Sequence, residues 1–230
     1  MFELFENREQ AGRALAAALA HHRNDPDLLV MGLARGGMPV AAPIARELGA
    51  ELDVLIIRKI RAPGHPELAI GAVGPDRVRV LNDDIIAHLG ISATALVHAT
   101  HKAREELAER EQRYRLHRPA SPVKGRTVLI VDDGLATGAS LEAAIAWARE
   151  AKAGKVIAAT PVAAAEAHQR LEKKVEEFVT LKTPWDFQAV SRWYRVFDQT
   201  SDDEVAALLE QLGPLATDKP GNDVGHRNCH

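Results

Sequence analysis

Residues 128–140 read VLIVDDGLATGAS, and this stretch decides the fold class. With Thr127 in front, it begins with five consecutive β-branched or leucine residues, which is typical of a strand. Two acids and a glycine then end the run, and a series of small residues leads into a segment that favours a helix over 139–151. The stretch therefore predicts a strand, a turn and a helix in succession, with both acids at the carboxyl end of the strand.

The same alternation continues on both sides of this stretch. Short apolar runs predict further strands, and alanine-rich or periodic segments between them predict helices. The predicted strands span 28–33, 52–57, 78–81, 127–131, 155–162 and 175–181, and the predicted helices span 7–22, 39–49, 92–117, 139–151, 163–173 and 201–213. Repeated alternation of this kind predicts an α/β fold with a doubly wound, mainly parallel sheet, in one domain over 1–212.

Local signals mark the ends of several predicted helices. Asn7 is placed to cap the first helix, and Gly49 is placed to end the second. Asn82 precedes a short acidic segment and is expected to cap a helical turn. Ser201 and Glu204 have the spacing of a capping box, which predicts the start of the last helix.

Three segments depart from the alternation. Residues 59–77 contain three prolines and three glycines without helical periodicity, which predicts a long flexible loop with a short β excursion over 68–73. Residues 183–200 follow the last predicted strand and have an irregular pattern. Residues 213–230 are polar and predict a disordered tail, in which His226, Cys229 and His230 are expected to bind metal only adventitiously.

The composition excludes several classes of protein. The 29 basic and 32 acidic residues give a net charge of −3. A dedicated nucleic-acid binder usually carries an excess of basic residues, so this charge disfavours that class. The single cysteine cannot form an internal disulfide. No apolar run approaches the roughly 20 residues that span a bilayer, and the first ten residues lack the apolar region of a signal peptide. We therefore expect a cytoplasmic protein that binds neither nucleic acid nor membranes.

Two predicted strands end in segments suited to anions. Residues 34–37 read ARGG; the glycines let backbone N–H groups approach an anion, and Arg35 can donate a bidentate pair of hydrogen bonds. An ordinary tight turn accounts for these glycines equally well. Residues 136–140 read ATGAS and offer hydroxyls and backbone N–H groups at the start of a helix.

The acids between these segments need a different partner. Asp132 and Asp133 would repel a phosphate, so we expect them to accept hydrogen bonds from sugar hydroxyls or to face Mg²⁺ held by the ligand. These acids lie beside one predicted phosphate site, and a second predicted anion site follows another strand. Together the three features indicate a sugar that carries two phosphate-containing groups.

Residues 128–140 closely resemble the phosphoribosyl-pyrophosphate (PRPP) signature of the type I phosphoribosyltransferases. Residues 34–37 resemble the pyrophosphate loop of that family, and 59–77 lie where the family has its flexible catalytic loop. The chain is most similar to bacterial members with an unassigned acceptor. The resemblance implies transfer of the 5-phosphoribosyl group of PRPP to a nitrogenous base, with release of pyrophosphate, in nucleotide salvage and with Mg²⁺ as cofactor. It also implies a homodimer and a small hood over the sugar site, for which residues 183–200 are the candidate.

The resemblance implies roles for individual residues. Asp132 and Asp133 would hold the ribose hydroxyls, with Mg²⁺ nearby but held mainly by PRPP, and residues 136–140 would cradle the 5′-phosphate. Lys59 or Arg58 would neutralise the departing pyrophosphate, and the family often has a cis peptide in its pyrophosphate loop. The catalytic candidates are Arg35, Lys59, Asp132 and Asp133, and the substrate-binding candidates are Ala34, Gly36, Gly37, Arg58, Gly134, Ala136, Thr137, Gly138, Ala139 and Ser140.

The acceptor is less well indicated. Ala136 stands where relatives that act on 6-oxopurines carry an acid, which disfavours hypoxanthine and guanine. The chain has only 3 Trp, 2 Tyr and 5 Phe, and half of them lie within 185–197. Stacking on a base and packing in a core or dimer interface account for this cluster equally well. The candidates for base contact are Trp185, Phe187, Trp193 and Tyr194.

Other functions remain as alternatives. The main one is a regulator that binds PRPP without turnover, although the net charge and the lack of an appended domain disfavour it. A response-regulator receiver is disfavoured because the strand at 175–181 does not end in an acceptor aspartate, and no Walker A loop is present.

Overall fold

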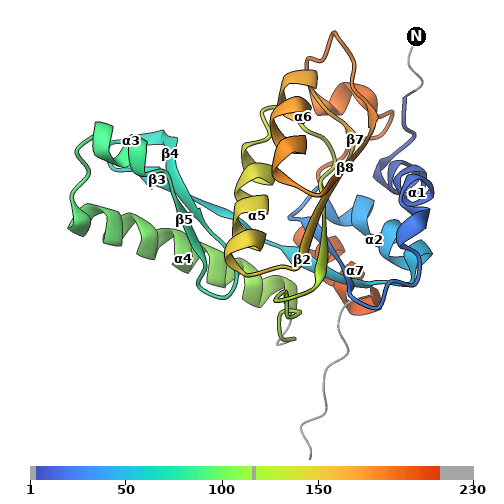
Figure 1. Cartoon of the computed structure of the whole chain (residues 1–230), viewed down its shortest axis with the longest axis horizontal. Helices are drawn as coiled ribbons and strands as arrows, with labels where there is room; N and C mark the ends of the chain where they lie inside the picture. Colours follow the sequence, from blue (N-terminus) through green and yellow to red (C-terminus); the bar gives the residue numbers. More distant parts are fainter. Residues whose placement is uncertain (1–3, 116–117, 213–230) are drawn as a thin grey trace, which may run out of the picture.

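The computed structural model describes residues 4–115 and 118–212 of the chain. Its centre is a five-stranded sheet in the order β2-β1-β6-β7-β8, in which all neighbouring strands run parallel (Figure 1). The strands are β1 (Leu28–Leu33), β2 (Glu51–Leu55), β6 (Thr127–Val131), β7 (Lys155–Val162) and β8 (Glu177–Lys182). The predicted parallel sheet is confirmed, and β1, β6 and β7 have the predicted bounds.

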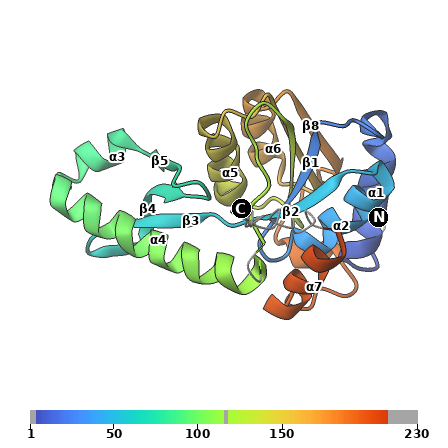
Figure 2. The same ribbon diagram turned by 90° about the horizontal axis from the view of Figure 1, so that it is seen from below.

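Helices cover both faces of this sheet, which confirms the doubly wound arrangement (Figure 2). Side chains of β1 alternate between two cores: Val30 packs with the helices of one face and Leu29 with those of the other. The first face carries α1 (Arg8–Ala18), α2 (Met38–Leu48) and α7 (Asp202–Leu212), and the second carries α5 (Ala139–Glu150) and α6 (Ala165–Leu171). Short 3-10 helices η1 (Ala20–His22), η2 (Glu172–Lys174) and η3 (Val190–Trp193) complete the described helices of this part.

The predicted helix caps are present. The Asn7 side chain accepts a hydrogen bond from the Gln10 N–H at 2.9 Å. Gly49 ends α2 with a φ of 68°, a conformation that glycine adopts without strain. Ser201 Oγ accepts from the Glu204 N–H at 3.1 Å, so the N-cap of α7 forms as predicted. None of the helices within 4–115 and 118–212 is long and apolar enough to cross a bilayer.

A second unit projects from one side of the parallel sheet (Figures 1 and 2). We call it the extension. It contains a three-stranded antiparallel sheet in the order β3-β4-β5, followed by two helices. Its elements are β3 (Arg58–Ala62), β4 (His65–Val73), β5 (Arg79–Leu81), α3 (Asp83–His88) and α4 (Ala93–Arg115). Asn82 caps α3 by accepting from the Ile85 N–H at 3.1 Å, as predicted.

The prediction of a long loop over 59–77 is wrong in its local structure, except that the predicted β excursion over 68–73 forms as part of β4. Strands β3 and β4 form a hairpin that turns at Gly64, where φ is 78°. Its buried residues Ile60 and Ile70 pack in one core with Leu107 of α4. The prolines and glycines hide the strand pattern in the sequence, and the apolar partner is a helix that begins only at Ala93. The flexibility of this segment stays a prediction.

Two buried contacts attach the extension to the parallel sheet. The Trp147 indole of α5 donates to the Pro75 carbonyl at 3.1 Å, and a Cβ at Gly74 would lie 2.4 Å from this indole. At the end of α4, Arg115 pairs with the fully buried Asp53 of β2 at 2.6 Å. The extension is therefore held against the central part of the molecule at two places, the turn before β5 and the last residue of α4.

Candidate functional site

The two predicted anion loops meet at the carboxyl edge of the parallel sheet. Gly32 of β1 pairs with Val131 of β6, so both strands end side by side. A Cβ at Gly36 would lie only 2.1 Å from Asp133 Oδ2, and one at Gly37 would lie 2.4 Å from the Val131 carbonyl oxygen. The close approach of these loops therefore requires glycine at both positions. The peptide bond between Ala34 and Arg35 is cis, as the resemblance implied.

The acid pair is half-buried, and a basic residue that the sequence analysis missed holds one member. Arg8, in the first turn of α1, donates through Nε to Asp133 Oδ2 at 2.8 Å. The Asp133 N–H in turn donates to Asp132 Oδ1 at 2.9 Å. The sequence places Arg8 just after a helix cap, but nothing local shows which edge of the sheet that helix end reaches.

The electrostatics of this pair favour a ligand that supplies positive charge or hydrogen-bond donors. Burial, and next the negative charge of Asp133, raise the pKa of Asp132 well above its ordinary value. Burial also raises the pKa of Asp133, although Arg8 opposes this change. Ionised carboxylates so close together in a half-buried site are destabilised, and sugar hydroxyls or a cation would relieve that cost.

The segment 136–140, which we call the anion cradle after its predicted role, leads from the acids into α5. Ala136, Thr137 and Ser140 are exposed, so a ligand can reach the loop. Gly138 has a φ of 77° and lies against Leu171, which fixes the turn before the helix begins. Arg170, a second residue missed from the sequence, donates to the Thr137 carbonyl at 2.7 Å. It supports the loop from behind and brings positive charge close to it.

The predicted hood packs directly on the acid pair. A Cβ at Gly134 would lie 2.4 Å from Val190 Cγ1, and the Tyr194 hydroxyl donates to the Asp133 carbonyl at 2.6 Å. Burial is the main cause that raises the pKa of Tyr194, so its hydroxyl stays protonated. The hood therefore braces the backbone that presents the carboxylates.

The hood aromatics divide into buried and exposed rings. Trp193 and Tyr194 are 8% and 5% exposed and pack with Phe5 in a small core of their own. This burial favours the packing role that the sequence left open for these two rings. Phe187 is half-buried against the same core, whereas Trp185 is 90% exposed and free of such packing.

The three basic side chains predicted to contact pyrophosphate, Arg35, Arg58 and Lys59, lie in different surroundings. Arg35 Nη1 lies 3.7 Å from Asp202 Oδ1 at the start of α7, and Arg58 pairs with Glu106 of α4. Lys59 instead lines a cleft of about 730 Å³ between the extension and α5, and this cleft reaches Ala139 at the start of α5. Lys59 is thus placed in a cavity that adjoins the anion cradle.

The same cleft can hold a small molecule. Its volume falls in the range of roughly 300–1,000 Å³ that is common for ligand pockets. Alanines of β4 and α5 form much of its wall. Its charged lining residues are Lys59, Asp83, Asp84, Glu142, Arg149 and Lys174.

Comparisons with known proteins agree on one family. Residues 3–194 match the family model described as the phosphoribosyl transferase domain. Two proteins of Mycobacterium tuberculosis, from strains CDC 1551 / Oshkosh and ATCC 25618 / H37Rv and each named "Putative phosphoribosyl transferase", are 46% identical over 209 residues, which is 91% of this chain and 47% of theirs. The chain thus spans about half the length of these curated relatives.

A solved structure extends the similarity to the fold. The crystal structure of TT1426 from Thermus thermophilus superposes with a TM-score of 0.82 at 42% identity. The match covers 92% of this chain and 100% of the TT1426 chain. The similarity therefore includes both the parallel sheet and the extension.

Proposed function

The chain belongs to the phosphoribosyltransferase family, a class of pentosyltransferases, and from this premise we propose that it transfers the 5-phosphoribosyl group of PRPP to a nitrogenous acceptor and releases pyrophosphate. One observation carries the proposal: Gly36 of one anion loop lies against the Asp133 carboxylate that follows β6. PRPP carries a 5′-phosphate and a pyrophosphate on one ribose, so its site needs two anion loops with hydroxyl acceptors between them.

Within this site, each loop has its own part. Residues 136–140 would bind the 5′-phosphate through backbone N–H groups and the hydroxyls of Thr137 and Ser140. Ala34, Gly36 and Gly37 would bind pyrophosphate along the backbone, and the Asp132 and Asp133 carboxylates would hold the ribose hydroxyls. Arg8 acts as a positioning residue, since it holds Asp133 at 2.8 Å without lying in either loop.

The residues at this edge fit Mg²⁺. Within the described part of the chain, the Asp132 carboxylate receives a hydrogen bond from the Asp133 N–H and none from a basic side chain. Its raised pKa means that burial and the charge of Asp133 destabilise the ionised carboxylate, and a bound cation would stabilise it. Carboxylate and phosphate oxygens are the ligands that Mg²⁺ prefers. When bound, the ion would neutralise charge on the pyrophosphate, with Asp132 and Asp133 beside it.

The extension supplies the remaining charge and shields the site. Lys59 lies in the cleft that adjoins the anion cradle and would stabilise negative charge on the departing pyrophosphate, with Arg58 beside it in β3. Arg35 would assist after leaving Asp202, from which it stands 3.7 Å away. Closure of the β3–β4 hairpin over the ribose would exclude water, which competes with the acceptor.

The acceptor would enter between Lys59 and the hood. Trp185, which is 90% exposed, is the hood ring best placed to stack on a base, and Phe187 is the next. A role in nucleotide salvage, a homodimer and a cytoplasmic location remain predictions that accompany this proposal.

A regulator that binds PRPP without turnover is the second candidate. The observation in its favour is that Arg35 and Arg58 are both engaged by acids, Asp202 and Glu106. Such pairing lowers the positive charge available to a leaving group. Turnover under saturating PRPP distinguishes the two candidates.

The test measures pyrophosphate release and PRPP binding in parallel, with Mg²⁺ and a panel of purine, pyrimidine and other nitrogenous bases. We expect one base to give release and Asp132→Asn to abolish it, whereas Asp203→Asn, an exposed acid of α7, should leave it unchanged. Tight PRPP binding without release for any base would support the regulator. Absence of PRPP binding would overturn both.

A further inference from the structure

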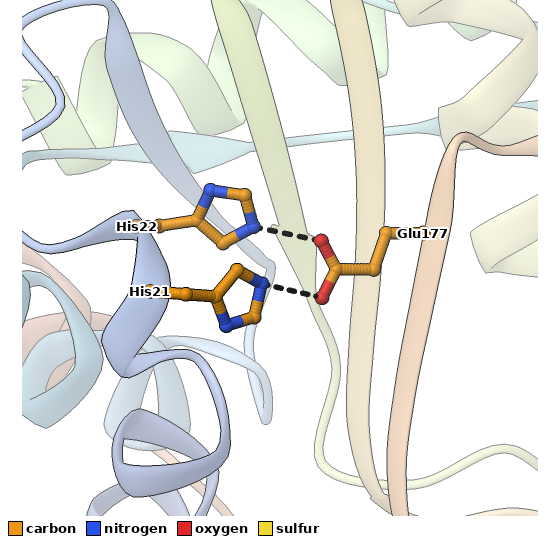
Figure 3. Close-up of side chains that lie close together, drawn as sticks. All are labelled: His21, His22 and Glu177. Atoms are coloured by element: carbon orange, nitrogen blue, oxygen red, sulfur yellow. Dashed lines mark hydrogen bonds and ion pairs between the residues drawn. The ribbon is translucent and has the colours of Figure 1, made fainter.

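A cluster of three potential metal ligands lies at the edge of the sheet opposite the anion loops. His21 and His22 belong to η1, which follows α1, and Glu177 is the first residue of β8 (Figure 3). His21 Nε2 lies 3.0 Å from Glu177 Oε1, and His22 Nε2 lies 2.7 Å from Oε2. Because the strands are parallel, the start of β8 lies far from the carboxyl edge that holds Asp132.

Three potential ligand side chains point toward one another here, whereas a surface ion pair brings together only two. One ligand atom from each of the three side chains lies within 4.8 Å of the other two, and no other such group of histidine, cysteine or acid side chains exists among the described residues. The imidazole rings lie 4.2 Å apart, and both turn their Nε2 atoms to the same carboxylate (Figure 3). The chain thus holds two nitrogens and an oxygen around one point.

We propose that His21, His22 and Glu177 form a binding site for a divalent transition-metal ion, with Zn²⁺ the best match. Two imidazoles and a carboxylate form an established ligand set for Zn²⁺, with water at the fourth position. Bonds of about 2.0–2.2 Å in tetrahedral geometry separate ligand atoms by roughly 3.3–3.5 Å. The present contacts of 2.7 and 3.0 Å would have to lengthen by roughly 0.3–0.8 Å to reach these separations.

The burial of the three side chains suits a bound ion that remains accessible. The side chains of His22, Glu177 and His21 are 9%, 30% and 56% exposed, so the site has a closed side and an open side. The ion would enter from the open side and bind each neutral imidazole through the Nε2 lone pair, with the ring proton on Nδ1.

The position of the site indicates what the ion does. It joins the end of α1 to the start of β8, two segments separated by 155 residues. Helix α1 carries Arg8 at its other end, where that residue holds Asp133. The ion would therefore clamp the helix that supports the acid pair, while taking no part in the reaction itself.

The experiment titrates Zn²⁺ into the full chain and follows heat of binding and Tm. Because His226, Cys229 and His230 are a competing source of ligands, the background chain carries all three as alanine. The test variants are His21→Gln and Glu177→Gln. The matched control is His101→Gln, which removes an exposed histidine that also pairs with a glutamate, Glu105, at 3.4 Å.

We expect one Zn²⁺ per chain and a higher Tm in the background chain and in the His101→Gln control. In both test variants the affinity should fall by more than the roughly 10–100-fold that loss of an outer hydrogen-bond partner costs. Substituting Co²⁺ should give the visible absorption of a tetrahedral ion in the background chain and the control, and in neither test variant. Absence of stoichiometric binding in the background chain, or binding that survives both substitutions, would overturn the proposal.

Discussion

The guanidinium of Arg8 lies 2.8 Å from the carboxylate of Asp133, across 125 positions of sequence. The same guanidinium donates to the Asp198 carbonyl at 2.6 Å and stacks 3.8 Å from the centre of the Phe197 ring. Arg8 thus joins the first helix, the hood and the acid pair in one contact. Arg8 lies outside both predicted anion loops, yet it fixes the position of the Asp133 carboxylate that the ribose would contact.

Replacing Arg8 should cost both stability and ligand affinity. In Arg8→Met, Asp133 keeps its burial but loses its cation, so the free energy of unfolding should fall by up to about 3 kcal/mol. PRPP affinity should fall with it, since the carboxylate is no longer held. Denaturant unfolding and PRPP titration measure these effects. Arg13→Met, which breaks an exposed pair with Glu9, should change stability by less than about 0.5 kcal/mol; equal effects of both substitutions would contradict the role of Arg8.

Asp132→Asn should stabilise the free protein while removing PRPP binding. The pKa of Asp132 is raised above 3.8 by burial and by Asp133, so the folded state binds more protons than the unfolded state between the ordinary and raised values. Stability therefore falls as the pH rises through this window. The amide introduced by the substitution does not ionise, so the variant does not lose stability as the pH rises through this window. Its Tm at pH 7 should therefore be higher than that of the parent. Thermal unfolding from pH 4 to 8 measures it, and a variant with the parent's pH dependence would refute this account.

The same ionisation gives PRPP binding a pH dependence. Mg²⁺ and ribose hydroxyls favour the ionised Asp132, whereas the free protein retains its proton to higher pH than an ordinary aspartate. Affinity should therefore rise with pH through the raised pKa and level off above it. Calorimetry in buffers of different ionisation enthalpy measures the proton release that accompanies binding. Proton uptake on binding would be the opposite of this expectation.

Gly36→Ala should weaken PRPP binding without unfolding the sheet. The new methyl would lie 2.1 Å from Asp133 Oδ2, and Arg8 prevents that carboxylate from moving aside freely. We expect a loss of at least about tenfold in affinity, or about 1.4 kcal/mol. Gly64→Ala is a useful comparison, because its methyl meets nothing within 4 Å although φ is 78°. It should lower stability and leave affinity unchanged.

Lys59→Met should reduce turnover more than PRPP affinity. If Lys59 acts on the charge that develops on the leaving pyrophosphate, its loss should lower kcat by about 10²–10³-fold, as for one oxyanion donor. Steady-state kinetics and PRPP titration separate the two quantities. Lys102→Met removes an exposed lysine of α4 that lines a neighbouring cavity and serves as control. A parallel loss of PRPP affinity and kcat would instead assign Lys59 to ground-state binding.

Much of the fold follows from local pattern. The strands 127–131 and 155–162 form as predicted because continuous apolar runs can be buried only inside a sheet covered on both faces. The two loops that we propose to bind anions could also be located from the sequence, since their glycines, acids and hydroxyls are consecutive in the chain. The hairpin over 59–77 was not, because its strand pattern carries prolines and its partner helix lies far along the sequence.

The amino-acid sequence by itself determined the sheet, its helices and the two loops that we propose to bind anions, since each rests on residues within a few positions of one another. Tertiary structure alone decided that Arg8 holds Asp133, that Arg170 supports Thr137, and that His21 and His22 meet Glu177. These partners lie 33 to 156 positions apart. Which side chains meet over such separations depends on how each helix packs on the sheet, and helical periodicity leaves that placement open.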